Sequence, residues 1–137
     1  MNREQAEEVF ARAPFIQHLG VRLVALGEGW LETELDLTPE LLQQHGFAHA
    51  GVVATLADHT AGGAATTVIG EGKTVLTSSY TIHLLRPAGG GLLHCRGEVV
   101  RAGTRLIVTQ ADVFSAGEHC ARYLGSMSVV DRPLGPG

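Results

Sequence analysis

The sequence predicts an α+β fold in which a curved antiparallel β-sheet wraps around one long helix. Three observations lead to this prediction. Residues 51–69 are the one long helix candidate, four strand-like segments follow them without another helix, and the repeated strand–helix alternation of parallel sheets is absent. At 137 residues, of which 45% are hydrophobic and 18% charged, the chain is expected to form a single domain over residues 1–137.

The first elements are a short helix and a hairpin. Residues 2–12 space their apolar side chains as an amphipathic helix does, and Pro14 stops this pattern. Residues 21–26 and 30–37 are separated by a Gly-Glu-Gly turn, and the second segment alternates apolar and polar residues. The two segments are therefore expected to pair as a β-hairpin.

A helical turn and a glycine-bracketed loop lead into the long helix. Thr38 as N-cap and Pro39 at the first helical position predict a turn over residues 40–44. The loop of residues 43–51 follows, before the helix of residues 51–69. This helix is rich in alanine and contains two glycines, which suits a helix that a sheet wraps closely.

The second half of the chain is expected to form four strands, separated by turns that contain glycine or proline. These strands are residues 74–86, 92–102, 105–115 and 119–130. In the first strand, the alternate residues from Leu76 to Leu84 are expected to face the helix. The cysteines Cys95 and Cys120 fall in strands, and their wide spacing argues against a disulfide framework or a zinc finger.

Charge is distributed unevenly behind a net value of −4. Residues 23–72 carry seven acidic side chains and no Lys or Arg, whereas residues 73–137 carry seven basic and four acidic side chains. The acidic balance, few aromatics and lack of a basic cluster argue against nucleic acid as a partner. Because the sequence also has no signal peptide or apolar run long enough for a membrane span, we expect a soluble, cytoplasmic protein without a membrane partner.

Asp58 stands out among the candidate functional residues. It is the single formally charged side chain between Glu40 and Glu71, and its helical neighbours are mostly alanine and glycine. No Lys or Arg lies nearby in the sequence, and Asp58 is too far inside the helix to cap it. Two interpretations stay open: a solvated or distantly Arg-paired carboxylate, or one kept free for chemistry.

His45 and His49 form the second feature. Their spacing of four could place two imidazoles on one helical face as metal ligands. Gly46 and Gly51 disfavour a regular helix there, and no third ligand stands at a recognisable offset, so no metal is expected. The alternative is a turn ahead of the helix that aims backbone N–H groups outward, which would suit an oxyanion.

The segment Gln43-x-x-Gly46-x-x-His49-Ala50-Gly51-x6-Asp58 resembles the hotdog-fold thioesterases, and within them the PaaI-like group of phenylacetate degradation. Their motif is approximately Asn-x-x-Gly-x-x-His-Gly-Gly, followed by a catalytic acid on the central helix. The resemblance extends over nearly the whole chain. It implies a hotdog fold, paired as a homodimer and often doubled to a homotetramer, with the active site between subunits. Ala50 and Gln43 depart from the motif, which has Gly and Asn there.

The resemblance implies hydrolysis of acyl-CoA thioesters without a cofactor. Asp58 would act as general base or nucleophile, which is enough because a thioester is already activated. The backbone amides of Ala50 and Gly51 would polarise the thioester carbonyl, and His49 would orient their turn. Gln43 would lie near the attacking water or the leaving sulfur.

Other residues are assigned by the same resemblance. Thr77 would reach into the site from the partner subunit. The turn of residues 101–105 suits bidentate contact with phosphate, although exposed arginines at strand ends are commonly just solvated. The residues expected to contact substrate and CoA are Arg101, Gly103, Thr104, Arg105, Ser79 and Arg86.

Two other functions are alternatives to thioester hydrolysis on the same fold. One is a non-catalytic acyl-CoA binding or sensing module on the same fold, against which the lack of a DNA-binding extension counts. The other is a hotdog hydratase or dehydratase, whose motifs of a catalytic His with Asp or Glu are not found.

Overall fold

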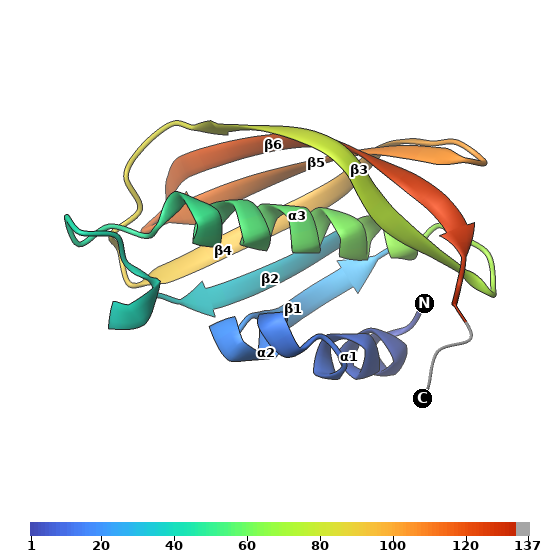
Figure 1. Ribbon diagram of the computed structural model, residues 1–137, viewed down its shortest axis with the longest axis horizontal. Coiled ribbons are helices and arrows are strands. Elements are labelled where there is room, and N and C mark those ends of the chain that lie inside the picture. The colour runs from blue at the N-terminus through green and yellow to red at the C-terminus, as the bar shows by residue number, and fades with distance from the viewer. Residues whose placement is uncertain (134–137) are drawn as a thin grey trace.

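A computed structural model describes residues 1–133 and confirms the α+β architecture (Figure 1). Within these residues, the helix α3 (Ala50–Thr66) lies in the hollow of a curved, six-stranded antiparallel sheet. The strand order is β1-β2-β4-β5-β6-β3, so β3 forms one edge of the sheet and β1 the other. This is the arrangement that the hotdog resemblance implies.

The strand predictions hold to within a few residues. The predicted hairpin is present as an antiparallel pair, and the four later strands also pair antiparallel. The strands are β1 (Arg22–Gly27), β2 (Trp30–Asp36), β3 (Lys73–Leu84), β4 (Leu92–Ala102), β5 (Leu106–Ser115) and β6 (Glu118–Asp131).

The N-terminal region differs from its prediction in two places. The first helix, α1 (Arg3–Ala11), ends before Pro14 as expected, but Pro14 also begins a second helix, α2 (Pro14–Leu19). Proline suits the first turn of a helix because the backbone N–H that it lacks would have no hydrogen-bond partner there. The turn predicted over residues 40–44 is a 3-10 helix, Pro39–Leu41, and Thr38 forms no side-chain capping bond.

The core lies between α3 and the concave face of the sheet. Small residues let the two approach closely: a Cβ atom on Gly97 of β4 would lie 2.7 Å from the carbonyl oxygen of Thr60. Thr60 also shares a hydrogen bond of 2.7 Å with the buried hydroxyl of Thr33 on β2. Cys95 and Cys120 are free and buried, as expected, and burial raises the pKa of the Cys95 thiol to about 12.

The prediction for β3 needs correction. An irregularity between Thr77 and Ser79 interrupts its pairing with β6 and reverses the alternation of its side chains. Leu76 pairs with Ser128 on the convex side and is 61% exposed. After the irregularity, Tyr80 stacks on the inward-facing Tyr123. Leu76 therefore does not pack on α3, because the period of two is broken within the strand.

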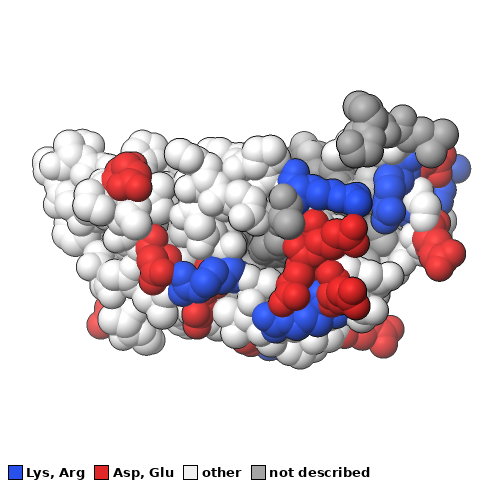
Figure 2. Space-filling model, turned by 90° about the horizontal axis from the view of Figure 1, so that it is seen from below, with Lys and Arg blue, Asp and Glu red and all other residues white. Residues whose placement is uncertain are grey.

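Acidic side chains of residues 23–72, which contain no Lys or Arg, form ion pairs with arginines outside that segment. Arg22 binds Asp36 at 2.5 Å, and Arg96 of β4 binds Glu32 of β2 at 2.7 Å. On the face seen from below, basic and acidic side chains lie next to one another (Figure 2). Among the described helices, none combines the length and apolar character needed to cross a membrane.

Candidate active site

Asp58 lies on α3 with its carboxylate turned toward two strands of the sheet. Its Oδ1 atom accepts hydrogen bonds from the Thr77 hydroxyl at 2.9 Å and from the Tyr123 hydroxyl at 2.6 Å. Within residues 1–133, Asp58 forms no ion pair with Lys or Arg, so the interpretation of a distantly paired carboxylate is wrong. Thr77 makes this contact within one chain, and its expected entry into a site shared with a partner subunit stays a prediction.

A cavity of about 230 Å³ opens beside this carboxylate. Its lining contains no Lys or Arg and consists of Met1, Ala6, Val9, Asp58, His59, Gly62, Gly63, Thr66, Thr74, Val75 and Thr77. Burial lowers the pKa of His59, against the opposing effect of the Asp58 charge. The imidazole beside Asp58 is therefore neutral at neutral pH and adds no positive charge next to the carboxylate.

Tyr123 is the site residue that sequence reasoning missed. It lies on β6 with none of its surface exposed, and its ring stacks on Tyr80 with 5.1 Å between ring centres. Burial, followed by the neighbouring Asp58, raises the pKa of the Tyr123 hydroxyl well above its usual range. The alternation along residues 119–130 could place Tyr123 on the inner face, but only the strand order brings it to Asp58.

The His49 turn forms the N-terminus of α3. The Nδ1 atom of His49 accepts a hydrogen bond from the Gly51 N–H at 2.9 Å, so His49 caps the helix through its side chain. The Gly51 amide thus donates to His49 in this structure, and its role in polarising a carbonyl stays a prediction. In the described part of the chain, the Ala50 N–H donates to no acceptor, and Ala50 lines the adjoining cavity.

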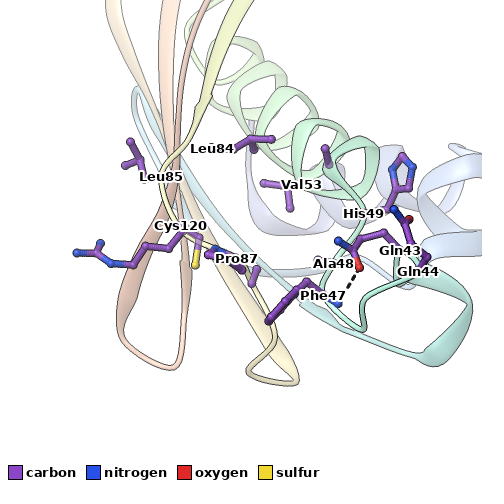
Figure 3. A pocket seen from close by; sticks show the side chains of 13 residues that line it. Gln43, Gln44, Phe47, Ala48, His49, Val53, Leu84, Leu85, Pro87 and Cys120 are labelled. Carbon is purple, nitrogen blue, oxygen red and sulfur yellow. Dashed lines mark hydrogen bonds between the residues drawn. The ribbon is translucent and has the colours of Figure 1, made fainter.

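A larger cavity of about 440 Å³ adjoins this turn (Figure 3). Figure 3 shows Gln43, Gln44 and His49 on one side of it and Leu85 and Cys120 on the other. The Oε1 atom of Gln43 accepts hydrogen bonds from the backbone N–H of His45 at 2.5 Å and of Phe47 at 3.3 Å. The Gln43 carboxamide thus stabilises the loop that lines this cavity, as a binding site requires.

The two parts of the predicted site do not share a cavity. His49 and Asp58 are nine residues apart on and just before α3, which corresponds to about 13 Å along a helix axis. His49 and Gln43 line the larger cavity, whereas Asp58 and Thr77 line the smaller one. A single carbonyl must lie about 3 Å from both its attacking group and its N–H donor, so one chain does not bring these groups together.

The residues predicted to contact CoA lie in three different places. Arg86 lines the larger cavity and donates to the carbonyl oxygen of His119 at 3.0 Å. The turn of residues 101–105 follows the far end of β4, about 33 Å along the strand from the end that adjoins the His49 loop. Ser79 pairs with Ser126 on the convex face of the sheet, away from Asp58.

The metal interpretation of the His45–His49 spacing gains no support from the structure. The ring nitrogen of His49 nearest the backbone already accepts the Gly51 N–H. Across residues 1–133, no three His, Cys, Asp or Glu side chains come together as ligands. The turn therefore serves as a helix cap.

Comparison with known proteins identifies the family. The family model of the thioesterase superfamily matches residues 45–121, more than half of the chain. The chain belongs to the thioesterase superfamily. A thioesterase family protein from Silicibacter pomeroyi is 34% identical with a TM-score of 0.89, and the match covers 94% of this chain and 98% of that one.

Two other solved structures are similar to this thioesterase-family chain. The E. coli PaaI protein from the phenylacetic acid degradation operon has a TM-score of 0.85 at 22% identity, covering 93% of this chain and 91% of that one. The BH2602 protein from Bacillus halodurans, solved with CoA, has a TM-score of 0.70 at 29% identity, covering 72% and 66%. The hotdog fold is confirmed and is shared with PaaI, and thioester hydrolysis is the reaction class that the family indicates.

Proposed function

We propose that this protein hydrolyses acyl-CoA thioesters to the free acid and CoA. The observation that carries the proposal is Asp58, a carboxylate held by two hydroxyl donors at the wall of a cavity whose described lining has no Lys or Arg. A carboxylate in such surroundings is a candidate for general base or nucleophile. The CoA that accompanies the similar B. halodurans protein supports CoA as part of the ligand.

In the proposed reaction, Asp58 either takes a proton from a water that attacks the thioester carbonyl or attacks that carbonyl itself. Negative charge then develops on the carbonyl oxygen. The Ala50 N–H would donate to this oxygen, and the N-terminus of α3 would favour the same charge. The C–S bond breaks as the carbonyl re-forms, and CoA leaves as the thiolate. When a water attacks, the free acid forms directly and Asp58 passes the proton on to the thiolate or to solvent. When Asp58 attacks, a mixed anhydride with Asp58 forms, and a water then hydrolyses it to the free acid and the Asp58 carboxylate.

Two copies of the chain would complete this site. The helix separates Asp58 from Ala50 within one chain, whereas the edge strand β3 exposes a surface on which Tyr80 and Leu84 are about half exposed. Unpaired edges of this kind are ready templates for a second chain. We therefore propose a dimer, in which Asp58 of one protomer acts with the His49 turn of its partner.

The CoA phosphates are proposed to bind the turn of residues 101–105. This turn lies toward the Asp58 cavity, because the Arg105 carbonyl accepts from Val129, and Val129 pairs with Val75 of the cavity wall. Arg101 and Arg105 could bind phosphate oxygens in a bidentate manner. Arg86 is proposed to serve the part of the ligand in the larger cavity, and Ser79, on the convex face, has no supporting contact.

The test is thiol release from a panel of aryl, short-chain and long-chain acyl-CoAs. We expect Asp58→Asn to lower kcat by roughly 10²- to 10⁴-fold, the usual contribution of a positioned acid or base. Asp36→Asn is the matched control, since Asp36 is exposed and joins a surface ion pair with Arg22.

Two results would contradict the proposal. Turnover by Asp58→Asn at the rate of the unaltered protein would remove Asp58 from the reaction. Saturable binding of every acyl-CoA tested, without thiol release by the unaltered protein, would instead favour the non-catalytic binding module.

A further inference from the structure

We infer that Tyr123 is a positioning residue that, with Thr77, holds one oxygen of Asp58 and leaves the other for the reaction. This inference rests on the proposed function, because it concerns how the Asp58 carboxylate is presented to the thioester. Tyr123 comes from β6 and Thr77 from β3, so two neighbouring strands together orient a side chain of the helix.

The hydrogen bonds identify which oxygen is held. Both donors bind Oδ1, the Tyr123 hydroxyl at 2.6 Å and the Thr77 hydroxyl at 2.9 Å. Two donors on one oxygen fix the rotation of the carboxylate and stabilise charge on that oxygen. Oδ2 receives no hydrogen bond within the described residues, so it is the oxygen available to a water or a carbonyl carbon.

The Tyr123 ring is itself held firmly. It is fully buried, and Tyr80 stacks on it with 27° between the ring planes. Gly125 provides the space for its hydroxyl, because a Cβ atom at this position would lie 2.3 Å from the hydroxyl oxygen. A rigid aromatic donor therefore sets the position of Asp58 more tightly than an exposed side chain such as Thr77 could alone.

The hydroxyl also keeps its proton over the range in which a carboxylate base works. Burial and the Asp58 charge both oppose formation of a phenolate, and they raise the pKa of Tyr123. Tyr123 thus acts as a hydrogen-bond donor throughout and does not exchange protons with the substrate. This separates its role from that of Asp58.

The kinetic test uses three variants of the full chain. Tyr123→Phe removes the hydroxyl and keeps the ring, and Gly125→Ala keeps the hydroxyl but displaces it from Asp58. We expect both to lower kcat by about ten- to a hundredfold, as a small misplacement of a catalytic group does, with KM changed less than about twofold. Ser128→Ala, which removes a hydroxyl on the convex face of the same strand β6, should leave kcat unchanged.

A second readout needs no turnover. Tyr80→Phe leaves Tyr123 as the sole tyrosine of a chain that has two, so ultraviolet absorbance follows its ionisation alone. Adding Asp58→Asn should move tyrosinate formation to lower pH, because the charged hydrogen-bond acceptor is gone.

The outcomes separate this inference from the proposed function. Tyrosinate formation at the same pH with and without Asp58 would overturn the inference, whether or not the protein hydrolyses thioesters. Hydrolysis by the unaltered protein together with full kcat in Tyr123→Phe would also overturn it while the proposed function stands. If the unaltered protein hydrolyses no thioester but Asp58→Asn still shifts tyrosinate formation, the proposed function is overturned, while the hydrogen bond between Tyr123 and Asp58 is supported.

Discussion

The His49 turn and the Asp58 cavity are built in different ways. The turn is made from neighbours in the sequence: His49 caps α3 by accepting the Gly51 N–H, and Gln43 braces the loop just before it. The cavity is made from segments far apart, since Asp58 receives its hydrogen bonds from positions 19 and 65 residues away. Hydrogen bonds between neighbours in the sequence form the His49 turn, whereas the register of the sheet forms the surroundings of Asp58.

This difference has a consequence for how each half responds to change. A change of side chain at a helix N-terminus alters the free energy of unfolding by about 1 kcal/mol, the usual contribution of a helix cap. The Asp58 cavity shares its walls with the core, where a single added methylene disturbs neighbours that cannot move. We therefore expect substitutions at the turn to alter catalysis with little loss of stability, and substitutions at the cavity to alter both.

After Asp58→Asn, the largest effect on kcat is expected from Ala50→Pro at the turn. Proline removes the N–H that is proposed to polarise the carbonyl, yet it suits the first residue of a helix, and His49 already has the extended backbone that precedes proline, with ψ of 138°. We expect kcat to fall by roughly 10²- to 10³-fold, as for a lost oxyanion donor. Thermal unfolding should show no loss of stability.

Ala50→Gly is the control, because it keeps the N–H. Mixing Ala50→Pro with Asp58→Asn protein after unfolding and refolding together tests the two halves directly. If they meet across a dimer, each mixed dimer regains one intact site, and random pairing restores about a quarter of the full activity. No recovery in a mixture shown to contain mixed dimers would mean that both halves act within one chain.

The same contrast explains what the sequence could and could not predict. The spacing of His49 and Asp58 on a helix, and the hairpins around them, follow from local periodicity and turn residues. The second donor to Asp58, Tyr123, depends on β6 lying beside β3, which no local pattern specifies. The irregularity between Thr77 and Ser79 also turns Leu76 to the convex face, against the prediction, because alternation alone assumes an uninterrupted strand; from Tyr80 onward the predicted inner face holds.

Two adjacent glycines of α3, Gly62 and Gly63, have different surroundings: the first has open space beside it, and the second packs against the core. A Cβ atom on Gly62 would lie 3.9 Å from Met127, an ordinary contact, whereas one on Gly63 would lie 2.8 Å from a methyl carbon of the buried Leu31. Both Ala variants gain helix propensity of up to about 1 kcal/mol, but Gly63→Ala also overpacks the core. We expect Gly62→Ala to be the more stable of the two by about 1–3 kcal/mol in denaturant unfolding.

Each of these variants serves as the other's control, because the residue change and the helix are the same. Equal free energies of unfolding for the two would show that Leu31 moves aside at little cost. The wall of the Asp58 cavity would then be no more constrained than the His49 turn, which would contradict the contrast between them.

The smallest effect is expected at the turn of residues 101–105, outside both cavities. Replacing Arg101 and Arg105 together by Ala should raise KM about three- to tenfold at low salt and largely spare kcat, since exposed charges contribute little each and act before the chemical step. The increase should shrink as salt is added, because counterions screen exposed pairs. Arg12→Ala, which removes an exposed charge paired with Glu8, is the control. A loss confined to kcat would place these arginines in the reaction itself. The basic second half of the chain would then contribute to the chemistry at Asp58 and not to binding of the coenzyme.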